Sequence, residues 1–170
     1  LNVKGKSFMG AKLKKISVKL STLMIEDEGF CGVEYKRADT RGATCGSSDQ
    51  SGELILDSNV LKDIPKNMAR DSNPFVITLK NNTLVNIKPY AFNGTKKLCR
   101  LKLTDNTFST LGPNSLSNII KEREKAAFME ASHPMIFIEN NKFSAIDKNA
   151  FQWSKGIRSE ERRVGKECRS

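Results

Sequence analysis

The sequence predicts an α/β solenoid, in which the 170-residue chain winds into successive coils that each contribute one short parallel strand. The first observation is that Asn59, Asn82, Asn106 and Asn141 follow one another at spacings of 23, 24 and 35 residues. The second is that apolar residues stand at the same distances from each asparagine, and such self-similarity is typical of stacked repeats. The third is that apolar residues alternate before each asparagine, which predicts a strand with one buried face.

Each of the four coils carries the same frame of large apolar residues. Two of them alternate before the asparagine, one stands two residues after it, and one stands three residues further on. One coil buries too little apolar surface to offset the entropy lost on ordering it, so stacking is required. The members are Leu54, Leu56, Leu61 and Ile64, then Ile77, Leu79, Leu84 and Ile87, then Leu101, Leu103, Phe108 and Leu111, and last Ile136, Ile138, Phe143 and Ile146.

The frame LxxLxLxxNxLxxL, followed five residues later by Phe or Leu, resembles the extracellular leucine-rich-repeat proteins over residues 52–157. The recurrence of Ala91-Phe92 as Ala150-Phe151 resembles the secreted and cell-surface branch of that family. The resemblance implies a right-handed coil with short parallel strands on its concave face and an irregular or helical convex side. The asparagines are expected to be structural, because each stands where the chain turns inward and its amide can bond the backbone groups that the turn leaves unpaired. A buried unpaired backbone group would cost roughly 1–3 kcal/mol.

Residues 1–28 form a basic segment for which the sequence predicts no single structure. All six lysines from Lys4 to Lys19 precede the first acidic residue, Glu26, and no clean signal peptide is evident. We keep three interpretations open, which are a strand, an amphipathic helix at a membrane surface, and sequence that does not fold. The strand would use Ile16, Val18 and Leu20, and the helix Leu13, Ile16, Leu20, Leu23 and Met24.

Residues 29–51 resemble the N-terminal cysteine cap of secreted repeat proteins. The resemblance implies a disulfide between Cys31 and Cys45, closing a loop worth roughly 3 kcal/mol. The family cap usually carries four cysteines and this segment carries two, so a pair of free thiols is the alternative. Cys99 stands at the entry to the third coil's strand. Two states are open for it, which are a free thiol and a disulfide with a cysteine outside the chain.

The third coil is about eleven residues longer than its neighbours. The excess lies between Ser117 and Pro134 and is rich in Glu, Lys and Ala. Apolar residues at helical spacing predict a helix on the convex side, which Pro134 would end.

Residues 158–170, RSEERRVGKECRS, look like the translation of a sequencing adapter, and we exclude them from fold reasoning. Ile157 stands 24 residues after His133 and suits the opening of a fifth coil. The sequence therefore predicts that this chain is a fragment and that the natural protein continues.

The predicted binding surface is the set of strand residues that alternate outward onto the concave face. Arg100 and Lys102 make its centre basic, and Met135 and Phe137 add apolar surface of the kind enriched at interfaces. The alternative is an ordinary solvated sheet face. The residues are Ile55, Asp57, Thr78, Lys80, Arg100, Lys102, Thr104, Met135, Phe137 and Glu139.

No catalytic, cofactor or metal site is predicted. His133 is the single histidine, and no cysteine or acidic cluster around it has metal-ligand spacing. Two triplets fit N-glycosylation, at Asn81 and at Asn93; we expect Asn93 to be the better acceptor because Asn81 adjoins the buried Asn82.

These observations favour a non-enzymatic module that recognises a protein ligand or receptor outside the cell, either secreted or as a receptor ectodomain. No transmembrane span is expected, because every apolar run is short. Nucleic acid is not an expected partner, since little net charge remains outside Lys4–Lys19 and residues 158–170. The alternatives are an intracellular structural or adaptor repeat protein, and a binder of polyanions or membrane surfaces that acts through the lysine-rich N-terminus.

Overall fold

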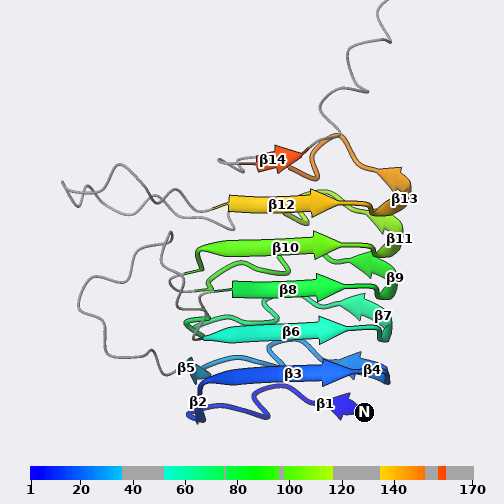
Figure 1. The fold of residues 1–170 in the computed structure, drawn as a ribbon. Coiled ribbons are helices and arrows are strands. Elements are labelled where there is room, and N and C mark those ends of the chain that lie inside the picture. The colour runs from blue at the N-terminus through cyan, green and yellow to red at the C-terminus, as the bar shows by residue number, and fades with distance from the viewer. Residues whose placement is uncertain (36–51, 75, 96–97, 117–134, 152–156, 160–170) are drawn as a thin grey trace, which may run out of the picture.

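The computed structural model describes residues 1–35, 52–74, 76–95, 98–116, 135–151 and 157–159. These residues form a stack of coils built from short parallel strands, and none of them is helical (Figure 1). Successive strands pair in parallel because each coil brings the chain back to the same edge in the same direction. The predicted stack of parallel strands is confirmed.

The front sheet is the six-stranded sheet that faces the viewer in Figure 1, in the order β14-β12-β10-β8-β6-β3. Residues that face opposite ways alternate along each strand, as in β10, where Leu101 and Leu103 are buried. The strands are β3 (Lys15–Lys19), β6 (Glu53–Asp57), β8 (Val76–Lys80), β10 (Arg100–Thr104), β12 (Met135–Glu139) and β14 (Ile157–Ser159).

The side sheet runs beside the front sheet, in the order β1-β4-β7-β9-β11-β13. The sequence predicted an irregular or helical convex side and did not predict these strands. From β4 onward, each side strand begins after a two-residue corner that follows a front strand. The strands are β1 (Asn2–Val3), β4 (Thr22–Ile25), β7 (Val60–Ile64), β9 (Thr83–Ile87), β11 (Thr107–Leu111) and β13 (Lys142–Ile146); a third, small sheet pairs β2 (Lys12–Leu13) with β5 (Glu34–Tyr35).

Left-handed backbone recurs at equivalent corners of the coils. The corner between front and side strands has φ between 50° and 56° at Leu20, Ser58, Asn81, Asp105 and Asn140. Asn, Asp and Ser suit such corners because their short polar side chains bond locally, whereas Leu is strained there. The corner after the side strands repeats at Lys6, Glu28, Asn67, Tyr90 and Asn114.

The core fills the space that the two sheets and the returning segments enclose. Leu54, Leu56, Ile77 and Leu79 are wholly buried, and one continuous cluster runs from Val3 to Ala150. Aromatic rings stack between adjacent coils, with centroids 4.9 Å apart for Phe108 and Phe143 and 5.5 Å for Phe8 and Phe30.

Residues 1–35 belong to this stack, although the sequence left residues 1–28 without a defined structure. Strand β3 pairs with β6 in full register, from Lys15 opposite Glu53 to Lys19 opposite Asp57. Ile16 and Leu23 are buried in the common core. The strand interpretation is therefore correct for Ile16 and Val18, whereas Leu20 lies at the exposed corner after β3; the helical and unfolded interpretations do not describe this segment. The predicted helix at 117–134 lies outside the described residues.

Candidate functional site

The asparagines form a ladder along the corner between the two sheets. The backbone N–H of Asn59 donates to Oδ1 of Asn82 at 2.9 Å, and Asn82 and Asn106 donate in the same way to the next asparagine of the series. Each Nδ2 also donates back to the carbonyl of a front strand, as from Asn82 to Leu56 at 2.8 Å and from Asn106 to Leu79 at 2.8 Å. These asparagines are structural, because their amides satisfy buried backbone groups.

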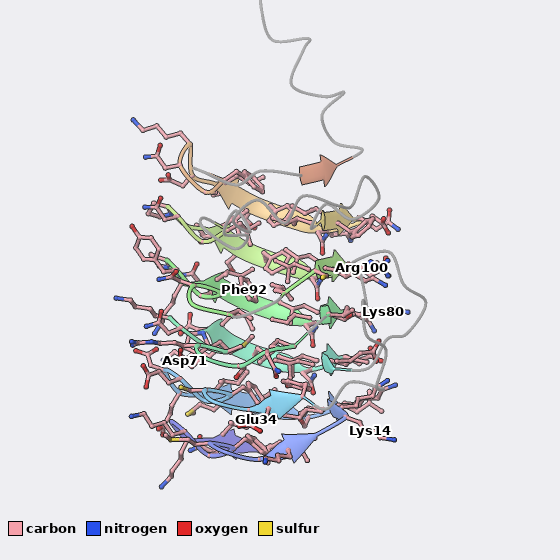
Figure 2. All side chains as sticks on the ribbon, turned by 90° about the vertical axis from the view of Figure 1, so that its left-hand side faces the viewer. Lys14, Glu34, Asp71, Lys80, Phe92 and Arg100 are labelled. Atoms are coloured by element: carbon pink, nitrogen blue, oxygen red, sulfur yellow. The ribbon has the colours of Figure 1, made fainter. Side chains whose placement is uncertain are left out.

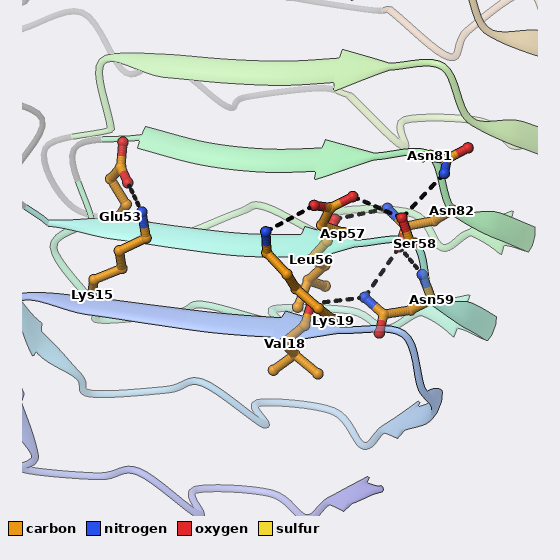
Figure 3. A network of polar contacts seen from close by, with 10 residues as sticks. All are labelled: Lys15, Val18, Lys19, Glu53, Leu56, Asp57, Ser58, Asn59, Asn81 and Asn82. Atoms are coloured by element: carbon orange, nitrogen blue, oxygen red, sulfur yellow. Dashed lines mark hydrogen bonds and ion pairs between the residues drawn. The ribbon is translucent and has the colours of Figure 1, made fainter.

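The ladder continues into the N-terminal coil through a serine. Ser21 donates from its backbone N–H and from Oγ to Oδ1 of Asn59, at 3.2 and 3.1 Å. Asn59 Nδ2 in turn donates to the carbonyl of Val18 at 3.0 Å (Figure 3). Ser21 thus occupies the position that asparagine holds in the other coils.

The outward residues of the front sheet stand in rows that cross the strands. Ile55, Thr78, Lys102 and Phe137 are consecutive neighbours in the middle row, and each is half-buried. Asp57, Lys80, Thr104 and Glu139 make a second row; Arg100 and Met135 adjoin in the third. The structure therefore places all ten predicted surface residues on consecutive strands of one sheet.

The sequence reasoning missed the start of each row. Lys15, Ser17 and Lys19 on β3, together with Glu53 and Val76, complete the three rows. The missing signal was Ile16-x-Val18-x-x-Ser21, which is the repeat frame with serine in place of asparagine.

Ion pairs neutralise the front sheet where β3 meets β6. Lys15 Nζ lies 2.8 Å from a carboxylate oxygen of Glu53, and Lys19 Nζ lies 3.2 Å from one of Asp57 (Figure 3). A hydrogen bond from Ser58, with help from Lys19 and Lys80, holds the pKa of Asp57 below its usual value. Both acids of this region are thus already matched by lysines of the preceding coil.

The basic run at the N-terminus is divided among separate acidic partners. Besides Lys15 and Lys19, Lys6 pairs with Glu28 at 3.9 Å and Lys12 with Glu34 at 3.7 Å. Four of the six lysines therefore face a carboxylate of the next coil, which reduces the positive field that a polyanion would meet.

Positive charge gathers on the next two strands, β8 and β10. Lys80 is exposed, and Arg100 and Lys102 are half-buried on the same face. Lys80 and Lys102 make no ion pair with any residue that the structure describes. Figure 2 shows Lys80 and Arg100 on the side of the stack opposite Asp71. We call Lys80, Arg100 and Lys102 the basic centre.

Cys31 is a free, buried thiol, so the predicted Cys31–Cys45 disulfide is not formed. The physical reason is that residues 29–35 are part of a coil and not a separate cap, which puts Cys31 beside the core residue Phe30. Burial, then Glu28 and Asp71, raise the pKa of this thiol, which lowers its reactivity. Cys45 lies outside the described residues, and Cys99 is buried and disulfide-bonded.

The two glycosylation triplets differ in exposure. Asn93 was expected to be the more accessible asparagine, but Asn81 is the more exposed of the two. Asn81 is exposed at a left-handed corner, where its Nδ2 donates to Ser58 Oγ at 3.1 Å. Asn93 is half-buried on the returning segment after Phe92. The crowding expected at Asn81 is therefore not observed.

A family model for leucine rich repeats matches residues 76–121, which begin at β8 and include β9, β10 and β11. This part of the chain carries leucine-rich repeats. No curated protein and no solved structure matches it.

Within the described part of the chain, no helix has the length and apolarity needed to cross a membrane. The same residues contain no group of three or more His, Cys, Asp or Glu side chains placed to hold a metal ion. The candidate site is the outer face of the front sheet, where the ten predicted surface residues lie on consecutive strands.

Proposed function

We propose that this chain is a non-enzymatic recognition module of an extracellular leucine-rich-repeat protein, either secreted or part of a receptor ectodomain. It binds a partner protein through the outer face of the front sheet, which is the concave face of a right-handed coil. Leucine-rich repeats support a role in protein interaction. The disulfide-bonded Cys99 supports an oxidising compartment, where such bonds persist.

The observation that carries the proposal is the difference between the two faces of the front sheet. One face packs in the core and the other does not. The inward residues of each strand, such as Leu101 and Leu103, are buried in the core. The outward residues between them, such as Lys102, place their side chains on the opposite face and do not contribute to the core. A rigid row of such residues on stacked coils provides an extended binding surface.

Two apolar side chains give this surface anchors of the kind that dominate binding energy. Ile55 and Phe137 are half-buried on the outward side, although neither belongs to the core. Burial of an aromatic side chain near the centre of an interface commonly contributes 2 kcal/mol or more, about 30-fold in affinity.

A binding screen with paired variants tests the proposal. The whole chain is screened against purified secreted and cell-surface proteins by biolayer interferometry, and each hit is repeated with a double variant, Lys102→Ala with Phe137→Ala. We expect the variant to stay folded and to weaken binding at least about tenfold.

The matched control carries Lys62→Ala with Ile146→Ala, two exposed residues of the side sheet. Binding that survives the front-sheet variant, or that falls equally with the control, would contradict the proposal. Replacement of Asn106 has the reverse profile, because it lowers stability without removing an outward side chain.

An intracellular structural or adaptor protein is the second candidate, and the free thiol of Cys31 favours it. Mass spectrometry of the purified native protein, alkylated after unfolding without reductant, separates the two. Labelling of both Cys31 and Cys99 would indicate a reducing compartment, whereas labelling of Cys31 without Cys99 supports the extracellular proposal.

A further inference from the structure

The charge of the front sheet is unevenly matched along the stack. Between β3 and β6, two lysines meet two carboxylates at 2.8 and 3.2 Å. On β8 and β10, Lys80 and Lys102 make no ion pair with a described residue, and neither strand carries an acidic residue. Positive charge is therefore concentrated at the middle of the face and not spread along it.

Apolar residues lie on both sides of this centre in the same row. Ile55 is the neighbour of Thr78 on one side, and Phe137 is the neighbour of Lys102 on the other. Adjacent strands are about 4.8 Å apart, so Ile55 and Phe137 are separated by about 14 Å across three strand intervals. That distance equals about four residues of extended polypeptide.

An extended chain that crosses the strands along this row presents alternate side chains to the sheet. Its first and fifth residues would lie over Phe137 and Ile55, and its third would lie between Lys102 and Thr78. An acidic third residue would come within reach of Lys102 and Lys80, which no described acidic residue pairs.

We propose that the partner segment recognised by this face is acidic and extended, with an apolar residue, an acidic centre and a second apolar residue at alternate positions. This inference rests on the proposed function and specifies its partner. A nucleic acid fits less well, because recognition of its backbone requires a longer stripe of positive charge than these two strands provide. Charge complementarity of this kind sets specificity and the rate of association.

Fluorescence anisotropy with labelled peptides tests the inference on the whole chain. The probe carries Leu-Asp-Glu-Asp-Leu between Gly-Ser flanks, and its matched control carries Leu-Asn-Gln-Asn-Leu. We expect the acidic probe to bind at least about tenfold more tightly than the neutral one, and to weaken between about 50 and about 300 mM salt.

Two charge-reversal variants locate the binding. Lys80→Glu with Lys102→Glu is expected to weaken the acidic probe at least about tenfold, because both cations are replaced by anions. Lys62→Glu with Lys142→Glu makes the same change in net charge on exposed residues of the side sheet and is expected to leave binding unchanged.

Four results would overturn the inference. Equal binding of both peptides, lost in the Lys80 and Lys102 variant, would remove the acidic partner and leave the proposed function standing. Single-stranded DNA that competes as well as the acidic peptide would indicate a general polyanion site. Binding of neither peptide would remove this partner. Binding lost only in the side-sheet variant would remove it too, and would also count against the front sheet as the binding face.

Discussion

The N-terminal coils, residues 1–35, and the repeat region, which is described over residues 52–74, 76–95, 98–116 and 135–151, follow the same path with different residues. The repeat region uses asparagine at every step of the ladder, whereas the N-terminal coil uses Ser21. Asn59, Asn82 and Asn106 each accept hydrogen bonds from one neighbouring coil and donate to the coils on both sides, whereas the side chain of Ser21 donates to Asn59 and to no other described residue. The comparison teaches that a smaller polar side chain is enough at a position that serves one neighbour.

The largest expected effect tests whether the N-terminal coils fold together with the repeats. Phe30 is fully buried and stacks on Phe8, so Phe30→Ala should lower the free energy of unfolding by about 4 kcal/mol through lost burial and a cavity. Urea unfolding followed by circular dichroism measures it. Phe92→Ala, in the repeat region, is the matched control and should cost a similar amount. A neutral Phe30→Ala would show that the two regions are not one cooperative unit.

Truncation of the ladder should distinguish an interior step from its end. Asn82→Ala removes hydrogen bonds to Asn59, Asn106 and Leu56 and leaves buried backbone groups unpaired, for a loss of about 3 kcal/mol. Ser21→Ala removes one side-chain bond and should cost about 1 kcal/mol. Thermal and urea denaturation of both variants measure the difference; equal losses would argue against the ladder as described.

The strained corner of the N-terminal coil predicts a stabilising substitution. Leu20 has a φ of 50° and is 83% exposed, whereas the same corner elsewhere has Ser, Asn or Asp. Leu20→Asn should raise stability by about 1 kcal/mol, because asparagine tolerates left-handed backbone and the exposed apolar side chain contributes nothing to the core. The reciprocal change, Asn81→Leu, should lower the melting temperature, and a Leu20→Asn protein that melts earlier would refute the comparison.

The smallest effect concerns the ion pair that joins the two regions. The pKa of Asp57 is lower in the folded chain than its ordinary value of 3.8, so its contribution is present above that value and is lost as pH falls through the folded pKa. Asp57→Asn should therefore cost about 0.5 kcal/mol at neutral pH and less in acid. Urea unfolding at about pH 7 and about pH 3 measures this change, with Asp105→Asn as an exposed control. A penalty that grows in acid has the wrong sign for this account.

The repeat region was predictable because its signals are local and recur. Asn82 and Asn106 share one apolar frame, so the strands, their register and the outward residues of β8 and β10 follow from alternation. The N-terminal coil was missed because Ser21 breaks the asparagine pattern and because residues 36–51 separate it from the next coil.

Three further features could not be read from the sequence, for physical reasons. The side sheet depends on hydrogen bonds between coils, and its members, such as Thr107-Phe108-Ser109, have no pattern distinct from that of an irregular segment. The state of Cys31 depends on whether its segment packs as a cap or as a coil, and cysteine spacing alone fits both. The ion pairs of β3 likewise appear only once Lys15 and Lys19 are placed beside β6.

Amide hydrogen exchange resolved to short segments tests most directly whether one continuous stack begins in the N-terminal coils. Strands β3 and β4 within residues 15–25 pair with β6 and β7, as β6 and β7 within residues 53–64 pair with β8 and β9. The account predicts slow exchange in both segments, with protection lost together on addition of urea. Exchange of residues 15–25 at the rate of an unfolded chain, while residues 53–64 stay protected, would contradict it.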